Sequence, residues 1–355
     1  MELQKTIDQA IDILRRWELG DTHFSLATSG STGEPATIEH SRAALQWSAE
    51  STLNTWFTHS NQPEDNTPLA PIQLCILPLN KAGGFMQLIR SAVWNAPIWI
   101  GPASANPFTE LELALIKNGE VIPFSPELWN QYKPNILSIT PMQLQLALNS
   151  ETGREILNQM HTVLIGGQAM DLKLEKQILE TFPITRWIHT FGSTETASHF
   201  AGRILNHNTA EYTLTAGSTL NTNESGEIQI SNPATGGHRI TLHDKIHQTS
   251  DTTFVWLERT NLVVNSGGVK IPIEPLEKEI SALLNWPLMS FYIAGQPHPI
   301  LGEELTLFTT HSTNDMQRII ATLDQLPKLH QPKKILFISE ITISNNGKIV
   351  RKINP

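Results

Sequence analysis

Short apolar runs alternate with helix-like segments between residues 70 and 190. Such runs, bounded by turn residues, are typical of strands buried on both faces. Two of the intervening segments have clear helix starts: Thr140-Pro141 supplies an N-cap and a first-turn proline, and Asp171 can cap the other. The alternation predicts an α/β fold with a mostly parallel, helix-covered sheet, whose ligands bind beyond the carboxyl ends of the strands. The expected strands are residues 73–77, 97–100, 121–124, 136–139, 162–165 and 186–190.

The pattern changes after residue 200. Short β-prone pieces at 227–230 and 254–257 are separated by turn-rich stretches, which predicts a small β subdomain. From residue 271 a second alternation begins and predicts a small α+β domain. We therefore expect an N-terminal domain of residues 1–258 and a mobile C-terminal domain of residues 259–355. The expected C-terminal elements are helices near 276–284 and 316–323 and strands near 291, 305 and 335.

Composition and targeting signals narrow the class of protein. The 355 residues have a formal net charge of -9 and no long basic run, which argues against nucleic acid or an anionic membrane surface as the main partner. The only cysteine, Cys75, excludes an internal disulfide. Ile7, Ile11 and Leu14 mark an amphipathic N-terminal helix rather than a signal peptide, and no apolar stretch is long enough to span a membrane. We expect a cytoplasmic protein, with its oligomeric state, a homo-oligomer included, left open.

The strongest local motif follows the strand-like residues 24–27 and reads Thr28-Ser29-Gly30-Ser31-Thr32-Gly33-Glu34-Pro35. Two glycines let the backbone approach a ligand closely, while hydroxyls and free N–H groups can surround phosphate oxygens. It is not the P-loop of NTPases, because no Gly-Lys-Ser/Thr follows at the required spacing. The motif predicts a phosphate cradle, although an exposed turn would have the same composition.

A second motif stands at the end of the expected strand 186–190 and reads Thr190-Phe191-Gly192-Ser193-Thr194-Glu195-Thr196. A carboxylate beside hydroxyls at a strand's carboxyl end can hold Mg²⁺ against phosphate. The alternative is a capped helix start in which Glu195 only favours the N-terminus.

Two further motifs are weak when taken alone. Arg259-Thr260-Asn261 precedes Asn265-Ser266-Gly267-Gly268-Val269-Lys270, a strand ending in a Gly-Gly turn. The last motif, Asn346-Gly347-Lys348-Ile349-Val350-Arg351, would ordinarily be interpreted as a solvated basic tail.

In this order the four motifs resemble the core motifs of the adenylate-forming superfamily, which includes acyl-CoA synthetases, luciferases and peptide-synthetase adenylation domains. The resemblance runs from residue 26 to residue 352. It implies ATP, Mg²⁺ and coenzyme A as ligands and an acyl-adenylate as intermediate. By this resemblance Lys348 reaches the reacting carboxylate, Thr194 and Glu195 contact the α-phosphate, and Glu195 also holds the metal. The resemblance also implies that the β- and γ-phosphates are bound by Thr28, Ser29, Gly30, Ser31, Thr32 and Gly33.

The same resemblance assigns the adenosine contacts. Phe191 takes the place of the aromatic ring that stacks on adenine, with Gly167 and Gln168 on the other side. A ribose-binding aspartate should precede Arg259 by a fixed interval, and the family spacing fits Asp244 rather than Asp251. The remaining nucleotide contacts are assigned to Gly192 and Ser193.

Within the superfamily the sequence is most similar to the o-succinylbenzoate-CoA ligases of menaquinone biosynthesis, particularly a short form. The likeness rests on Thr194-Glu195-Thr196-Ala197-Ser198-His199, on residues 254–259 and on residues 265–270. It implies a small carboxylic acid, o-succinylbenzoate, as substrate. In the family the C-terminal domain rotates about a hinge, here near Asn261, between the two half-reactions. Acid and CoA contacts are assigned to Lys81, His199, Gly267, Gly268 and Lys270.

Three positions depart from the family pattern. Ala36 stands where the phosphate loop usually has lysine, Asn261 replaces the hinge aspartate, and Glu258 replaces the glycine before Arg259. Glu34 adds a negative charge close to the expected phosphates, so we expect weakened ATP binding with activity retained. Two alternatives stay open: an adenylating enzyme that loads its acid onto another thiol, such as that of a carrier protein, and a non-catalytic nucleotide-binding relative.

Overall fold

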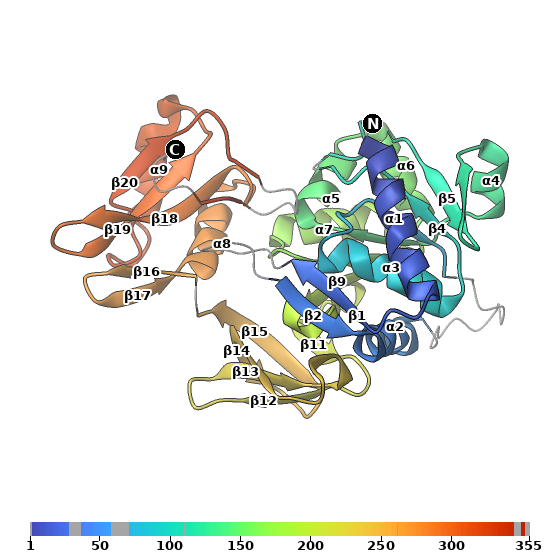
Figure 1. Cartoon of the computed structure of the whole chain (residues 1–355). Helices are drawn as coiled ribbons and strands as arrows, with labels where there is room; N and C mark the ends of the chain where they lie inside the picture. The colour runs from blue at the N-terminus through green and yellow to red at the C-terminus, as the bar shows by residue number, and fades with distance from the viewer. Residues whose placement is uncertain are drawn as a thin grey trace.

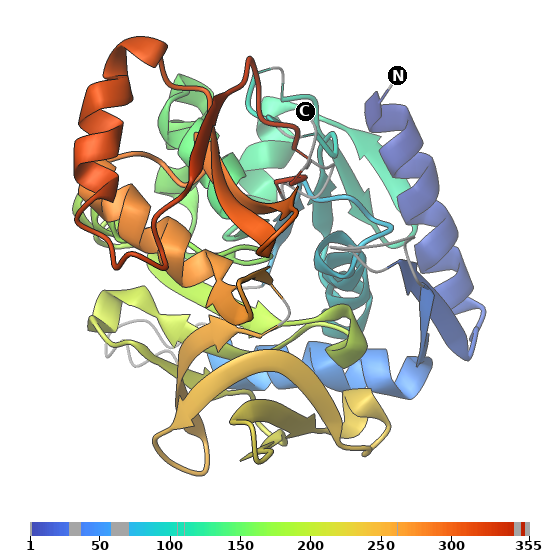
Figure 2. The ribbon, with the colours of Figure 1, turned by 90° about the vertical axis from the view of Figure 1, so that its left-hand side faces the viewer.

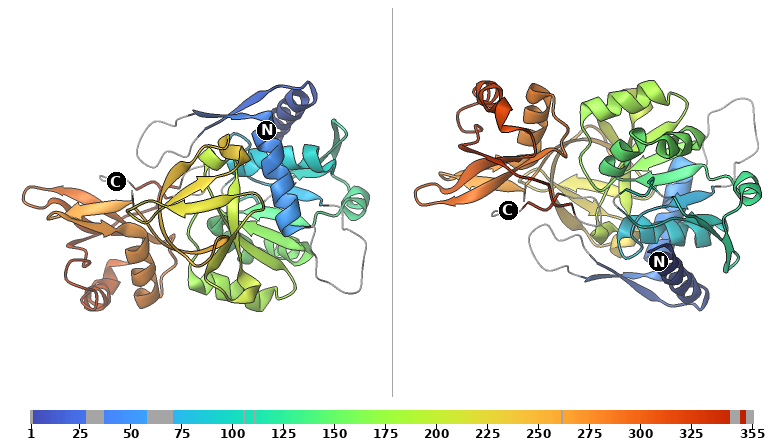
Figure 3. Two further views of the ribbon diagram at one scale, coloured as in Figure 1. Left: turned by 90° about the horizontal axis from the view of Figure 1, so that it is seen from below. Right: turned by 90° about the horizontal axis from the view of Figure 1, so that it is seen from above.

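The chain folds into a large lobe built on one long sheet and a smaller C-terminal lobe beside it (Figures 1 and 3). The computed structural model describes residues 2–27, 37–57, 71–104, 106–109, 111–260, 262–343 and 349–351. The phosphate motif from Thr28 to Pro35, Ala36, the hinge residue Asn261 and the lysine Lys348 all lie outside these residues.

The centre of the large sheet is parallel, as the apolar runs predict. Its five strands lie in the order β4-β3-β7-β8-β9 and pair in parallel throughout. Because parallel neighbours end at the same edge, the loops after β8 and β9 come together there. The bounds are β3 Gln73–Cys75, β4 Ile98–Ile100, β7 Ile136–Ile139, β8 Thr162–Ile165 and β9 Arg186–Gly192.

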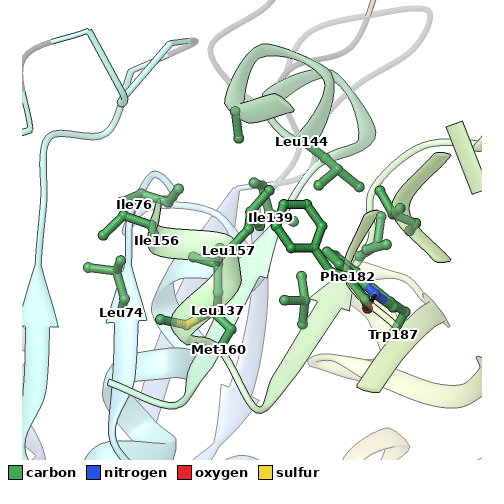
Figure 4. Close-up of a cluster of buried hydrophobic side chains, with 14 of the residues drawn as sticks. Leu74, Ile76, Leu137, Ile139, Leu144, Ile156, Leu157, Met160, Phe182 and Trp187 are labelled. Carbon is green, nitrogen blue, oxygen red and sulfur yellow. Dashed lines mark hydrogen bonds between the residues drawn. The ribbon is translucent and has the colours of Figure 1, made fainter. Parts of the chain in front are cut away.

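Helices cover both faces of this sheet. Alternate residues of a strand point to opposite faces, so Leu74 joins one hydrophobic core and Cys75 the other. The first core, drawn in Figure 4, packs under α5 Pro141–Leu148, α6 Glu151–Gln159 and α7 Leu172–Thr181, and it contains the fully buried Trp187. The second packs under α1 Glu2–Glu18, α2 Arg42–Trp56 and α3 Ala82–Trp94. The predicted α/β fold class is therefore confirmed, as are the helix caps at Thr140 and Asp171.

The β-rich stretch after residue 200 was expected as a small β subdomain, and its strands are continuous with the large sheet. β10 pairs antiparallel with β9, and the remaining strands follow in the order β11-β15-β14-β13-β12. Local turns predict strands but not their partners, so the sequence could not place this hairpin series on the sheet. These strands still share a core of their own. The bounds are β10 His199–Ile204, β11 Glu211–Leu214, β12 Thr219–Thr222, β13 Glu227–Ser231, β14 Ile240–Gln248 and β15 Thr253–Arg259.

At the opposite edge of the large sheet the strands pair antiparallel and not parallel. The predicted strand at 121–124 is present as β6 Glu120–Pro123, but it is an antiparallel edge strand. It pairs with β5 Ala114–Lys117, which the apolar pattern did not separate from the preceding loop, and β5 in turn pairs antiparallel with β4. The short helix α4 Pro126–Gln131 follows.

The phosphate motif joins two paired strands. β1 His23–Ala27 and β2 Thr37–Ser41 form a separate antiparallel hairpin in which Ala27 lies opposite Thr37. Ala27 and Thr37, which flank the motif in the sequence, are therefore held side by side.

The C-terminal lobe has its own sheet and core, and Figure 2 views this lobe from its outer side. β15 still belongs to the large sheet at Arg259, whereas β16 begins the small sheet at Val263. The change of sheet supports the predicted division of the chain, which stays a prediction. The bounds are β16 Val263–Ser266, β17 Val269–Pro272, α8 Ile273–Leu284, β18 Phe291–His298, β19 Gly302–Thr309, α9 Met316–Leu323 and β20 Lys334–Phe337.

In the part of the chain that the structure describes, every helix is too short or too polar to cross a membrane.

Candidate active site

A cavity of about 390 Å³ lies where the large sheet meets the C-terminal lobe. The strand ends and loops of the large lobe form one wall, and α8 with residues 349–351 forms another. The predicted nucleotide residues that line it are Gly167, Gln168, Phe191, Gly192, Asp244 and Arg259. Residues from four separate segments of the chain therefore come together at the carboxyl edge of the sheet.

Phe191 reaches this cavity from the end of β9. Its ring makes edge contacts with Phe200, Tyr212 and Phe254 at centroid distances of 5.6, 5.5 and 5.6 Å. These rings fix the orientation of Phe191 and form an apolar surface suited to a flat aromatic ligand.

A buried hydrogen-bond chain ties the loop after β8 to this aromatic group. His189 Nε2 lies 3.1 Å from the carbonyl oxygen of Gln168, and the Tyr212 hydroxyl lies 2.8 Å from His189 Nδ1. Burial lowers the pKa of His189 to about 4, so the ring is neutral near pH 7, and burial raises the pKa of Tyr212 to about 12. A neutral imidazole donates through one nitrogen and accepts through the other, so His189 donates to Gln168 and accepts from Tyr212.

Asp244 and Arg259 face each other across β14 and β15. They occupy paired register positions, and Arg259 Nε lies 3.3 Å from Asp244 Oδ1. Trp256 Nε1 donates to the same oxygen at 2.9 Å. The Asp244 side chain is only 7% exposed yet lines the cavity, whereas Asp251 is exposed in the turn after β14 and does not line it. Asp244 therefore lies at the cavity and Asp251 does not, and the assignment of the ribose to Asp244 stays a prediction.

The predicted magnesium element is a single 3₁₀ turn, Thr194–Thr196, directly after β9. Ser193 caps it, because its backbone N–H donates to the Thr196 hydroxyl at 3.0 Å. Gly192 packs against the following chain so closely that a Cβ there would lie 2.4 Å from the Ser198 carbonyl oxygen. This packing folds the turn back on itself and leaves the Glu195 side chain exposed.

The β1–β2 hairpin is fastened to that turn by His40. His40 Nε2 lies 2.7 Å from the Thr194 carbonyl oxygen, and the residue is only 4% exposed. Burial lowers the pKa of His40, so the neutral ring donates this hydrogen bond. The hairpin that carries the phosphate motif is thus held beside Thr194 and Glu195.

Arg90 on α3 is a buried cation with no carboxylate partner among the described residues. It donates to the Ser198 hydroxyl at 2.6 Å and lies 3.4 Å from His199 Nδ1. Its Nε has no hydrogen-bond partner among the residues that the structure describes, and burial lowers its pKa to about 10, which leaves it charged near neutral pH. Burial and the charge of Arg90 lower the pKa of His199 well below its ordinary value. The described part of the chain therefore places no counter-charge against the Arg90 guanidinium.

Residues 349–351 line the cavity, and an ion pair attaches them to α8. Arg351 donates to Glu277 of α8 at 2.7 Å, and the second oxygen of Glu277 accepts from the backbone N–H of Ile293 at 2.7 Å. Ile349, the residue after Lys348, lines the cavity.

The remaining predicted residues lie elsewhere. Gly267 and Gly268 form the β16–β17 turn with positive φ values of 59° and 81° that favour glycine, and Lys270 lines a second cavity of about 280 Å³ that Arg259 also borders. Lys81 precedes α3, with its Nζ 3.5 Å from the Ala27 carbonyl oxygen. Eight predicted site residues are not among the described residues that line the first cavity: Lys81, Ser193, Thr194, Glu195, His199, Gly267, Gly268 and Lys270.

Sequence reasoning missed four side chains that shape the site: His40, Arg90, Tyr212 and Trp256. The signal for Arg90 was a charged residue inside an apolar helix. The others lie on strands, and their partners lie on other segments of the chain, so a single sequence carries no comparable signal for them.

A sequence profile of the family described as AMP-binding enzyme matches residues 13–238. The chain belongs to this family. The AMP-binding match ends before β14, so Asp244, Arg259 and the C-terminal lobe lie beyond it.

Relatives of this AMP-binding chain extend the similarity over its whole length. It is 24% identical to 2-succinylbenzoate--CoA ligase of Listeria monocytogenes, over 99% of this chain and 73% of the relative. An acyl-CoA synthetase (AMP-forming)/AMP-acid ligase II-like protein from Dyadobacter fermentans is 26% identical, with a TM-score of 0.58 over 97% of this chain and 92% of its own. An o-succinylbenzoate CoA synthetase from Bacillus subtilis, solved in complex with its acyl-adenylate intermediate, shares the fold, with 16% identity and a TM-score of 0.68 over 92% of this chain and 67% of its own.

Proposed function

We propose that this chain is an AMP-forming carboxylate-CoA ligase that works through an acyl-adenylate. The observation that carries the proposal is the cavity between the lobes, which combines an aromatic platform, a buried carboxylate and an arginine in the order that the adenylate-forming resemblance implies. The family membership and the names of the relatives point to the same reaction. A cytoplasmic location is part of the proposal.

The residues of the cavity fit adenosine monophosphate. Adenine would lie between Phe191 and the loop at Gly167 and Gln168, whose φ of 84° at Gly167 suits a glycine. Asp244 would accept from the ribose hydroxyls, and Arg259 would hold both the carboxylate and the nucleotide.

Mg²⁺ suits the turn at Thr194 and Glu195. This ion is usually held by one or two carboxylates together with substrate phosphates, and Glu195 supplies an exposed carboxylate beside the hairpin of the phosphate motif. Among the described residues no group of three or more acidic, histidine or cysteine side chains could hold a metal ion. When bound there, the ion offsets phosphate charge.

Adenylation is the first step. A carboxylate oxygen of the acid attacks the α-phosphorus of ATP, the bond to the bridging oxygen breaks, and pyrophosphate leaves. Lys348 acts at the charge that develops between carboxylate and α-phosphate. Arg351, paired with Glu277, attaches the chain end that carries Lys348 to α8.

Thioester formation is the second step. The thiol of coenzyme A loses its proton and attacks the acyl carbonyl, and AMP leaves as the mixed anhydride breaks. The Gly267-Gly268 turn and Lys270 lie outside the nucleotide cavity, so their assignment to coenzyme A requires the C-terminal lobe to rotate about the hinge near Asn261.

For the acid we propose o-succinylbenzoate, a dicarboxylate. Adenylation consumes one carboxylate, and the second needs a cationic site. Arg90 offers a buried positive charge beside His199, which the resemblance assigns to the substrate, and no carboxylate in the described part of the chain neutralises it. A monocarboxylic acid would leave that charge uncompensated.

Exchange of labelled pyrophosphate into ATP tests the reaction class. Addition of o-succinylbenzoate should start the exchange, and coenzyme A should then be consumed at the rate at which AMP appears. Exchange without consumption of free coenzyme A would favour a carrier-protein thiol as acceptor. Tight ATP binding without exchange for any acid would favour the non-catalytic relative.

Restoring the missing loop lysine should tighten ATP binding. Ala36 lies outside the described residues, but it precedes β2, whose first residue is held opposite Ala27. A cation within about 4 Å of phosphate contributes roughly 1 to 4 kcal/mol, with screening favouring the low end. We expect Ala36→Lys to lower the ATP Kd at least several-fold at low salt and less at moderate salt.

Lys81 provides the control for that variant. Its ammonium lies beside Ala27, at the start of the phosphate motif, and could already offset the charge. If Lys81 serves this purpose, Ala36→Lys will tighten ATP binding more strongly when combined with Lys81→Met. Unchanged Kd and KM values for ATP in both backgrounds at both salts would mean that residue 36 points away from the triphosphate.

A further inference from the structure

Trp256 stands between the predicted ribose carboxylate and the C-terminal lobe. Its indole N–H donates to Asp244 Oδ1 at 2.9 Å, and its ring lies under the ammonium of Lys278, 4.2 Å from the ring centroid. Lys278 belongs to α8, so the two lobes meet at this ring. All three side chains line the nucleotide cavity.

A β-bulge aims Trp256 at Asp244. Asp244 pairs with Arg259 and Lys245 with Glu258, but the next residue, Ile246, pairs with Trp256, so Leu257 is an extra residue in β15. In a regular strand residues 256 and 259 would point to opposite faces. The extra residue places both on the side of Asp244, and a bulge commonly redirects a side chain in this way beside a functional site.

The two oxygens of Asp244 are unequally occupied by the described residues. Oδ1 accepts from Trp256 Nε1 at 2.9 Å and from Arg259 Nε at 3.3 Å, whereas Oδ2 has only the longer contact of 3.5 Å with an Arg259 amino group. A carboxylate has about four acceptor positions, so Oδ2 keeps capacity for further donors. The indole hydrogen bond therefore determines which oxygen remains available to a ligand in the cavity.

We propose that Trp256 is a positioning residue for the nucleotide: by holding Oδ1, it turns Oδ2 of Asp244 toward the ribose hydroxyls. Lys278 keeps the indole plane in place from the other lobe. The inference rests on the proposed function, because it takes Asp244 as the ribose contact. It adds a residue that the AMP-binding match, which ends at residue 238, does not reach.

The test compares ATP with 2′,3′-dideoxy-ATP in acid-dependent pyrophosphate exchange. Trp256→Phe keeps an aromatic ring and removes the N–H, and we expect kcat/KM for ATP to fall about 10- to 100-fold, the range of one hydrogen bond to a charged group. For the dideoxy nucleotide kcat/KM should stay near the wild-type value, so that the preference for ATP collapses. A merely structural role would lower both values together and preserve their ratio.

Trp129→Phe is the matched control. Trp129 also donates its indole N–H to a carbonyl-type oxygen, that of Gln159 at 3.2 Å, but it lies on α4 outside the cavity, and its loss should leave the ratio unchanged. Trp256→Met is the second variant if Trp256→Phe does not fold; it also lacks a donor for Asp244, and it should show the same collapse.

Asp244→Asn separates failure of the inference from failure of the proposed function. If Asp244→Asn keeps the wild-type preference for ATP, Asp244 is not the ribose contact and the proposed nucleotide site is wrong. If Asp244→Asn abolishes the preference while both Trp256 variants retain it, the site stands and the inference about Trp256 is overturned.

Discussion

Replacing Lys348 with alanine should lower adenylation by several orders of magnitude and affect thiolysis of supplied acyl-adenylate far less. The next residue, Ile349, lines the nucleotide cavity, and Arg351 ties the same segment to Glu277. A cation brought to this place stabilises charge that develops only while pyrophosphate leaves, so the effect falls on the first transition state. Single-turnover measurements of each half-reaction provide the comparison.

The matched control is Lys328→Ala, which removes an exposed lysine of the C-terminal lobe that does not line the cavity. It should leave both half-reactions unchanged. An equal loss of both half-reactions in Lys348→Ala would contradict the role of Lys348 in adenylation.

Replacing Arg90 with methionine should raise the KM for o-succinylbenzoate by about 10- to 100-fold and leave the KM for ATP near its wild-type value. A hydrogen bond to a charged group contributes about 1.5 to 3 kcal/mol, and about 1.4 kcal/mol is a factor of ten. Arg90 is 3% exposed and has no carboxylate partner in the described part of the chain, so the substrate's second carboxylate would provide its counter-charge.

Two controls separate substrate binding from folding. The acid 4-oxo-4-phenylbutanoate keeps the succinyl carboxylate and lacks the aromatic one, and Arg90→Met should use it as well as the wild type does. Because methionine replaces an uncompensated buried charge, the Tm without ligand should fall little or rise. An equal loss with both acids would show that Arg90 supports the fold and does not recognise the diacid.

Local patterns were sufficient to predict the central fold. The apolar runs that became β7 and β8 coincide with the observed strands because both are buried on each face and bounded by turns. Thr140 and Asp171 act as N-caps because their side chains accept from the backbone three residues later, which is local chemistry. The strand β5 was missed, and the continuity of the antiparallel series from β10 with the large sheet was not predicted, because strand pairing depends on contacts distant in sequence.

The residues of the candidate site were likewise predicted only in part. Asp244 and Phe191 were assigned through the resemblance to the adenylate-forming superfamily, and the cavity brings them together. The role of Trp256 was not predicted, because the direction of its side chain depends on a bulge at Leu257 that no residue type in the sequence indicates. Arg90 is visible in the sequence as a charge in an apolar helix, but only the structure shows that no carboxylate of the described residues pairs with it.

The most direct test of the account is an analysis of products with o-succinylbenzoate, ATP and coenzyme A as substrates. Mass spectrometry and nucleotide chromatography should detect AMP, pyrophosphate and the CoA thioester, with AMP and thioester in equal amounts, and chelation of Mg²⁺ should stop the reaction. Turnover of another acid with the same AMP stoichiometry would change the substrate and preserve the reaction class. Formation of ADP and phosphate, or the absence of a thioester with every acid supplied, would contradict the account.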